Sequence, residues 1–443
     1  MSNSTTDLGK ESIGRLLLKL ATPSIIAQLV NVLYNIVDRI FIGRMQNGDV
    51  AMAGIGVAFP IVLLVSAFAA FVGMGGAPLA AIKMGEKDNN EAEKIMTNSF
   101  SVLLIIAGIL TVIFMIFKEP ILWKFGASES TIKYATDYLG IYLIGTVFVQ
   151  IALGMNPFVN TQGFAKIGMM TVTIGAIINI ILDPILIFGL NMGVKGAAVA
   201  TIVAQAVSAI WVLRFLTGKK TILKLRKKYL KIDIKTMKPV FALGIAPFIM
   251  QSTESLVLVS LNSQLQKYGG DLAIGAMTAI TSINLLFYMP VFGISQGMQT
   301  IIAYNYGAKQ FDRAKKALSI GMIGAIGILS LGLIATRLFP EILIGIFTKD
   351  ATLMELALNG ISIYSLTLPA VGICILGAVY FQSIGNAKMS IVLSLLRQVI
   401  VFIPLILLIP KLLGLNGVWL AFPAAEFVTM LITLYGLVKA IRK

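Results

Sequence analysis

Histidine is absent from the 443-residue sequence, and cysteine occurs once, as Cys374. Without an imidazole, any proton-coupled chemistry falls to carboxylates. A single cysteine excludes an internal disulfide and argues against a thiolate metal site. The sequence also lacks a phosphate-binding Gly-Lys-Ser/Thr loop, an HExxH zinc motif and a nucleophile elbow. We therefore expect neither enzyme activity nor a cofactor.

Charged residues are scarce as well, at 13%, whereas 57% of the residues are hydrophobic. Apolar stretches of about twenty residues or more, the length that crosses a bilayer as a helix, follow one another from end to end. The composition predicts an all-α membrane protein with twelve transmembrane helices. We place these spans at 15–43, 52–82, 95–117, 134–161, 168–190, 196–216, 239–264, 271–303, 317–339, 353–381, 389–410 and 416–438.

The net charge of +16 comes from residues that lie between the apolar stretches. If the N-terminus is cytoplasmic, 25 Lys and Arg fall on the cytoplasmic side and nine on the opposite side. Such a bias predicts a multi-pass protein of the plasma membrane with both termini in the cytoplasm. It also argues for a lipid bilayer, and against nucleic acid, as the partner of the basic residues.

The chain repeats itself at an offset of about 222 residues: GDVAMAG matches GDLAIGA, and KMGEKDNNEAEK matches NYGAKQFDRAKK. Six spans in each half give the two repeats parallel topology, related by a pseudo-two-fold axis along the membrane normal. We expect an N-terminal lobe at 1–218, a basic cytoplasmic linker at 219–238 and a C-terminal lobe at 239–443. The linker is predicted to be a solvated strap attracted to anionic lipid head groups, with a dedicated ligand site as the alternative.

Polar residues share one face of the first predicted helix. Asn31, Tyr34, Asn35 and Asp38 lie at positions i, i+3, i+4 and i+7. Because an ionisable group at bilayer depth costs about 2.5–3.5 kcal/mol, this face should look into the bundle or a cavity. Pro23 provides a place for the helix to bend.

The fifth span carries the stretch NIILDPILIFG. Asn179 and Asp183 share a helix face, and Pro184 should leave the carbonyl of Ile180 without its usual helical partner. These oxygens suit Na⁺, and the same carboxylate could instead carry a proton if burial raises its pKa. Thr201 on the sixth span adds a hydroxyl at a similar depth. The alternative is a polar network that only locks the first, fifth and sixth helices together.

The second half holds a different set of charges. Glu254, with Gln251 as a neighbour, lies near the middle of the seventh span, and Arg397 is the only cation inside a span of this half. A functional glutamate and a structural Glu254–Arg397 pair are equally compatible with the sequence. For Glu426 we expect a packing or hydrogen-bonding role. The counterpart of the Asp-Pro pair keeps its proline, Pro404, but not its acid, so ion coupling should reside in the N-terminal lobe.

Large, soft side chains near predicted kinks are candidates for an adaptable apolar cavity, although most such residues are ordinary core. The candidates are Met155, Tyr288, Met289, Met298 and Tyr364.

The two six-helix halves and the motifs YNIVDRIFIG, GEKDNNEAEK, NIILDPILIFG and GAAVAT resemble the multidrug and toxic compound extrusion (MATE) transporters, in particular their MepA-like and DinF-like bacterial branches. The resemblance spans the whole chain. It implies a V-shaped pair of bundles that exports organic, often cationic, compounds against entering Na⁺ or H⁺. The family's cation site then falls on Asp38, Asn179, Asp183 and Thr201, with Ala197 as a backbone contributor. Glu254 matches a glutamate of the NorM-like branch, but the acid of that branch in the tenth helix has no counterpart here.

We therefore predict a monomeric secondary antiporter for organic, cationic compounds, coupled to H⁺ or Na⁺. Na⁺ is the only metal expected. The runner-up is a flippase for lipid-linked oligosaccharides, which would need a more cationic cavity. A non-transporting receptor or scaffold is the third reading, disfavoured by the parallel repeat and the paired acids.

Overall fold

The computed structural model describes residues 7–348 and 350–442, apart from the side chain of residue 255. Within these ranges all regular structure is helical. The helices are α1 (Ile13–Gly43), α2 (Gly48–Gly85), α3 (Asn89–Lys124), α4 (Ile132–Ile144), α5 (Thr146–Thr161), α6 (Ala165–Pro184), α7 (Val194–Thr217), α8 (Ile234–Gly307), α9 (Phe311–Leu338), α10 (Pro340–Gly345), α11 (Ala351–Tyr364), α12 (Leu368–Ser383), α13 (Ala387–Leu395), α14 (Phe402–Leu413) and α15 (Leu415–Ile441). Two π-helices continue α6 and α13, at Ile185–Gly189 and Leu396–Val401.

The helices account for the twelve predicted spans. In the described part of the chain, ten helical segments are long and apolar enough to cross a membrane, and α4 with α5 forms an eleventh span bent by 60°. The segment α8 holds two spans, because Gly270 at its middle has a φ of 65° and reverses the chain. A positive φ of this kind is readily adopted only by glycine. The predicted all-α fold class is confirmed.

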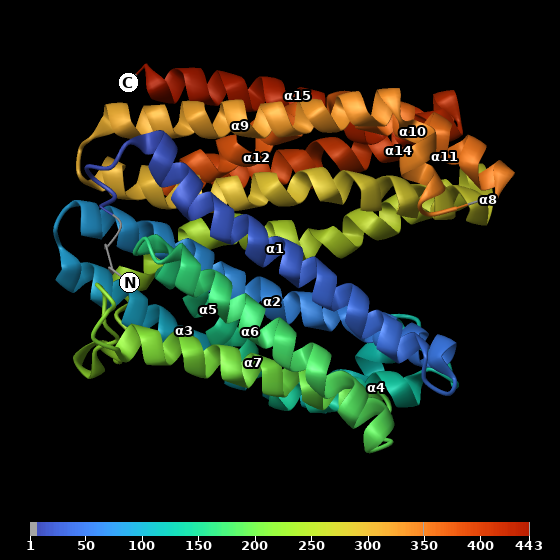
Figure 1. The fold of residues 1–443 in the computed structure, drawn as a ribbon, viewed down its shortest axis with the longest axis horizontal. Coiled ribbons are helices and arrows are strands. Elements are labelled where there is room, and N and C mark those ends of the chain that lie inside the picture. The colour runs from blue at the N-terminus through green and yellow to red at the C-terminus, as the bar shows by residue number, and fades with distance from the viewer. Residues whose placement is uncertain (1–6, 349, 443) are drawn as a thin grey trace.

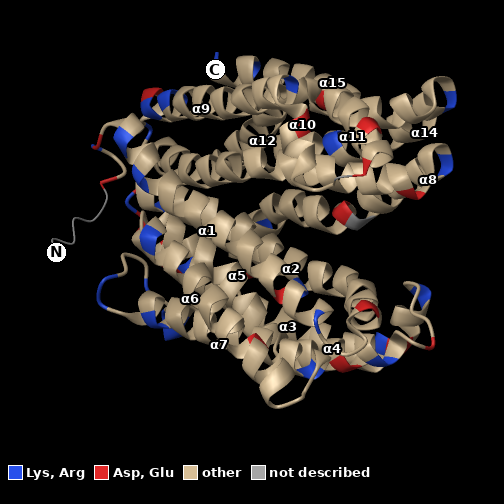
Figure 2. Cartoon of the chain, turned by 45° about the vertical axis from the view of Figure 1, so that its right-hand side comes forward, with Lys and Arg blue, Asp and Glu red and all other residues tan. Residues whose placement is uncertain are grey.

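Figure 1 shows two bundles, with α2–α7 in the lower one (the N-lobe), α8–α15 in the upper one (the C-lobe) and α1 running between them. Each bundle is filled by two clusters of buried apolar side chains, one toward each end of the helices. Charged residues gather at the two ends of the bundles and leave the middle largely apolar (Figure 2). Such a distribution suits helices surrounded by lipid, whose backbone groups are all paired internally.

Helix α1 belongs to both lobes and runs obliquely from one bundle to the other (Figure 1). Its first half packs into the C-lobe, because Leu16 and Leu20 are part of the apolar cluster of that lobe. Ile25 lies so close to Gly293 of α8 that a Cβ added to this glycine would come within 2.3 Å of it. Near the other end of the helix, Ile42 is part of an N-lobe cluster. A movement of one lobe relative to the other must therefore displace or bend α1.

A polar clamp fixes the segment that precedes α1 to the C-lobe. The guanidinium of Arg313 donates to the carbonyl oxygens of Leu8 and Glu11, at 3.2 and 2.8 Å. Asn305 donates to the carbonyl of Leu8 at 3.0 Å and accepts from Arg313 at 2.9 Å. Pro23 is buried within α1, which is helical throughout Ile13–Gly43. The bend at Pro23 therefore stays a prediction.

The lobes also touch where α2 crosses α8. We call the end of the bundles that carries the segment between α7 and α8 the linker end, and the opposite end the far end. Near the linker end, a Cβ added to Gly244 would lie 1.8 Å from the carbonyl oxygen of Phe71, and one on Gly75 would lie 2.3 Å from that of Val240. Small residues allow helix backbones to approach this closely. Gln382 of the C-lobe completes the contact by donating to the carbonyl of Met74 at 3.0 Å.

Replacing Gly244 with Ala should force this contact apart, because the added methyl group overlaps a backbone oxygen that cannot swing away. Overpacking of this kind costs about 1–3 kcal/mol. We expect a lower thermal unfolding midpoint for purified Gly244→Ala, whereas Gly327→Ala should match the wild type because nothing lies within 4 Å of that position. Equal unfolding midpoints for the two variants would contradict the close crossing.

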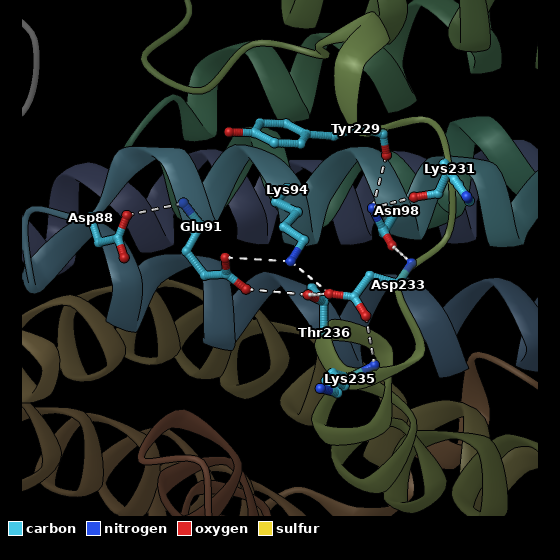
Figure 3. Close-up of polar contacts among 9 residues, drawn as sticks. All are labelled: Asp88, Glu91, Lys94, Asn98, Tyr229, Lys231, Asp233, Lys235 and Thr236. Atoms are coloured by element: carbon cyan, nitrogen blue, oxygen red, sulfur yellow. Dashed lines mark hydrogen bonds and ion pairs between the residues drawn. The ribbon is translucent and has the colours of Figure 1, made fainter.

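The segment between α7 and α8 is not a solvated strap, and that prediction is wrong for its backbone. Figure 3 shows that this segment lies along α3, where Asn98 forms hydrogen bonds to it at two positions. The Asn98 amide donates to the carbonyl of Tyr229 at 2.8 Å and accepts from the amide of Asp233 at 2.6 Å. An ion pair of 2.6 Å joins Lys94 of α3 to Asp233. The linker is thereby attached to the N-lobe up to the first residue of α8.

The start of the same segment is held just as closely. Gln162 accepts from the backbone amides of Ile222 and Leu223, at 2.8 and 2.7 Å. Glu93 of α3, whose side chain is 7% exposed, forms a 2.8 Å ion pair with Arg226. Leu223 is fully buried. Most of the linker lysines remain exposed, so the predicted attraction to anionic lipids stays a prediction.

The Lys94–Asp233 ion pair forms only in the pH range in which Asp233 is ionised. Hydrogen bonds from Lys94, from the amide of Lys235 and from the Thr236 hydroxyl lower the pKa of Asp233 to about 2. Because this pKa is lowered, ionised Asp233 stabilises the docked linker at any pH above the ordinary pKa of an aspartate. This stabilisation is lost as the pH falls toward 2. The pair is therefore fully formed at neutral pH.

We predict that Asp233→Asn loosens the linker. Amide hydrogen exchange over residues 224–236 should be faster than in the wild type at pH 6–8, and the difference should shrink as the pH falls below about 4. Lys227→Gln is the matched control, because Lys227 is exposed and belongs to the same linker. Unchanged exchange in Asp233→Asn would show that the ion pair does not hold the linker.

Candidate functional site

The structure brings together the two N-lobe acids singled out in the sequence. Asp38 on α1 and Asp183 on α6 are close enough for their carboxyl groups to influence each other electrostatically. The amide of Asn179 donates to Asp183 at 3.4 Å, and both of these side chains are buried. Because α1 also packs into the C-lobe, Asp38 is the member of the cluster that connects it to the other bundle.

Several oxygens of this cluster have unused acceptor capacity. Asp38 Oδ1, Asn179 Oδ1 and Asp183 Oδ2 are buried and accept no hydrogen bond from any described residue. A buried carboxylate oxygen without a partner is costly in a protein interior. Protonation of a carboxyl group, or a cation among the three oxygens, would remove that cost. The donor set contains only hard oxygen atoms, which fits H⁺ or Na⁺.

The other predicted members lie around this cluster in different ways. Thr201 donates to the carbonyl of Ala197 at 3.0 Å, within α7. Asn35 donates to the carbonyl of Asn31 at 2.7 Å, and both of these residues are exposed. Tyr34 is half-buried on the same face, within electrostatic range of both acids. The polar face of α1 therefore has an exposed part and a part near the acids.

The local geometry after Asp183 agrees with the expected disturbance by Pro184. The chain continues as the π-helix Ile185–Gly189, in which the amide of Leu190 donates to the carbonyl of Ile185 at 2.9 Å. Single π turns are frequent at functional sites because they free backbone groups. The unpaired carbonyl of Ile180 stays a prediction.

Two tyrosines that sequence reasoning missed complete the surroundings. Tyr138 and Tyr142 on α4 are buried, with ring centroids 6.2 Å apart. Their spacing of four residues marks a common helix face, but only the fold shows that this face is buried in the N-lobe, in the apolar cluster that also contains Ile42 of α1.

The C-lobe charges pair differently from the structural alternative given above. Arg397 does not pair with Glu254. Its Nε instead donates to Glu426 at 2.6 Å, with side chains 18% and 2% exposed. Glu254 is exposed and has no ion-pair partner among the described residues. The structure therefore argues against the Glu254–Arg397 pair, one of the two alternatives left open by the sequence, and the hydrogen-bonding role expected for Glu426 takes the form of a buried ion pair.

The residues proposed for an apolar cavity divide into two groups. Met155 and Met298 are fully buried in the apolar clusters of the N-lobe and the C-lobe, and their place in a substrate cavity stays a prediction. Tyr288 and Met289 are half-buried, and Tyr364 stacks on Phe422 with centroids 4.5 Å apart. Gln251, also assigned to the C-lobe site, is half-buried near Glu254.

The model of the MatE family matches residues 23–185 and 245–408, which start 222 residues apart like the internal repeat. The chain belongs to the MATE family. It is 27% identical to the multidrug export protein MepA of Staphylococcus haemolyticus, over 96% of this chain and 93% of that protein. It is 28% identical to an FAD transporter of Shewanella oneidensis, over 93% and 91% of the two chains.

Solved structures agree with this fold. One is an outward-facing multidrug resistance MATE transporter of the MOP superfamily, at a TM-score of 0.92 and 22% identity over the full length of both chains. Another is a MOP superfamily transporter from Pyrococcus furiosus, with the same TM-score, identity and coverage. This MATE protein is a membrane transporter of a multidrug export family.

Proposed function

We propose that this MATE protein is a secondary antiporter of the plasma membrane that exports small organic compounds, cations among them, in exchange for H⁺ or Na⁺. The observation that supports this most is the position of Asp38. It sits on a helix anchored in the C-lobe, and its carboxyl group meets Asp183 of the N-lobe. A change in the charge of these two carboxyl groups can therefore affect the position of α1 relative to both lobes.

Both termini are proposed to lie in the cytoplasm, so the linker end is the cytoplasmic end. The glycine-mediated contacts of α2 with α8 then close the path to the cytoplasm. An entering cation neutralises the acids and changes the relative energies of two arrangements of α1. A ligand can shift such an equilibrium only by its difference in affinity for the two states. Ion and exported compound therefore drive each other by favouring opposite arrangements.

The coupling carboxylate can be tested by a charge-neutral replacement. Asp183→Asn keeps the shape of the side chain but can neither release a proton nor supply a full negative charge to Na⁺. We expect efflux of ethidium driven by an imposed pH or Na⁺ gradient to fall by about 100-fold or more in inverted vesicles, the size of loss typical of a removed proton-transfer group. The two gradients, applied in turn, also identify the coupling ion.

Asp137→Asn is the matched control for this experiment. Asp137 lies in the same lobe but pairs with Lys195 at 3.5 Å, away from the acid cluster. Its replacement should leave gradient-driven efflux close to the wild type. Full efflux by Asp183→Asn at normal expression would refute the proposed coupling site.

A further inference from the structure

The Arg397–Glu426 pair lies inside the C-lobe and uses only part of its bonding capacity. The pair itself consumes Nε of the guanidinium and Oε1 of the carboxylate. Oε2 of Glu426 is buried and has no partner among the described residues, and the same holds for the hydroxyl of Tyr288. The remaining two guanidinium nitrogens of Arg397 accordingly form a fork with no hydrogen-bond acceptor in the described chain.

This arrangement is expensive if the ion pair serves only to hold helices together. A buried pair offsets its desolvation only when its remaining donors and acceptors are satisfied. Here a carboxylate oxygen and a tyrosine hydroxyl are buried without a partner among the described residues. Half-satisfied networks of this kind cost more than an apolar core of the same shape.

The surroundings have the form of a recognition site. The rings of Tyr288 and Tyr364 lie within electrostatic range of both charges. Tyr364 stacks on Phe422, one helical turn before Glu426 on α15, at an interplanar angle of 13°. Aromatic walls with a few buried polar groups are the usual lining of small-molecule sites. Arg397 is 18% exposed, so the fork is accessible although the pair is deep in the bundle.

The fifth span of each half contains a π-helix. Arg397 lies in the π-helix Leu396–Val401, which precedes Pro404, and the N-lobe acids adjoin the π-helix Ile185–Gly189, which follows Pro184. The fifth span of the N-lobe therefore carries an acid, whereas that of the C-lobe contributes a cation to an overall neutral pair.

The charges left open specify the ligand. A lone cation would meet Glu426 but also the repulsion of Arg397, and a lone anion would meet the reverse. A compound that carries both a carboxylate and a cationic amine satisfies both groups. The planar guanidinium fork matches a carboxylate with two parallel hydrogen bonds, and the second carboxylate oxygen of Glu426 accepts from the amine.

We propose that Arg397 and Glu426 form a binding site in the C-lobe for zwitterionic organic compounds, with the ligand's carboxylate on Arg397 and its cationic part at Glu426. This inference rests on the proposed export function and adds a substrate class to it. The organic cations named there would lack the carboxylate and bind more weakly at this site.

Two dyes that differ by one methyl group provide the test. Rhodamine 110 carries a free carboxylate beside its cationic ring system, and rhodamine 123 is its methyl ester and a simple cation. Binding to purified wild-type protein is followed by fluorescence without any ion gradient. We expect rhodamine 110 to bind roughly tenfold more tightly than rhodamine 123, the size of effect expected for a charge-assisted pair in a partly buried site. If the wild-type protein bound both dyes equally, or bound the ester more tightly, that result would be enough to overturn the proposal.

A double variant locates the preference. Arg397→Gln/Glu426→Gln removes both charges together and so avoids a single unpaired buried ion. The ratio of the two dissociation constants should approach one in this variant. In Arg337→Gln, whose exposed guanidinium donates to the carbonyl of Ser362, the ratio should match the wild type. An unchanged ratio in the double variant would assign the discrimination to another site and refute the proposal.

The outcome for the export function is separate. Gradient-driven efflux of rhodamine 123 by the wild type reports on transport, whereas the binding ratio reports on the C-lobe site. Efflux of both dyes with no difference in binding would keep the transporter and reject the zwitterion site. A tenfold preference in binding without efflux of either dye would keep the site and reject the proposed export function.

Discussion

The carboxyl groups of Asp38, which is half-buried on α1, and Asp183, which is fully buried on α6, are the constraint on which the rest of the structure depends. Two negative charges brought together in a poorly solvated site repel each other unless a proton or a cation joins them. Only one of the two helices is confined to the N-lobe. The other, α1, is clamped to the C-lobe by Arg313 and by its contact with Gly293. The electrostatic requirement of the acids therefore acts on the relative position of the lobes.

The contacts between the lobes allow that requirement to be transmitted. Near the linker end, α2 and α8 meet through glycines, which bring the two backbones close together. Aromatic side chains also pack across this contact, with Phe71 stacked on Phe241 at a centroid distance of 5.4 Å. The linker is fixed to α3 by Asn98, Lys94 and Glu93. The linker consequently moves with the N-lobe. When the two lobes move relative to each other, the chain must therefore bend in α8 after Asp233 and in α1.

The features that the sequence predicted correctly depend on residues that are close together along the chain. Long apolar runs predicted the helices, and the spacing of Asn179 and Asp183 predicted their common face, because helical periodicity is a short-range property. The choice of Glu426 over Glu254 as the partner of Arg397 could not be predicted, since it depends on how α13, α14 and α15 pack. The burial of Met155 and Met298 follows from packing in the same way. The docking of the linker was missed because its partners lie about 130 residues earlier in the chain, as the 131 residues between Asn98 and Tyr229 illustrate.

The most direct test of the central claim is the distance between the lobes as a function of ion occupancy. Spin labels at Ser130 and Leu412, both exposed at the far end, would report this distance by pulsed electron paramagnetic resonance in a Cys374→Ala background. The account predicts that lowering the pH or adding Na⁺ shifts the distance distribution of the wild type and leaves that of Asp183→Asn unchanged. An equal ion-dependent shift in Asp183→Asn would contradict it.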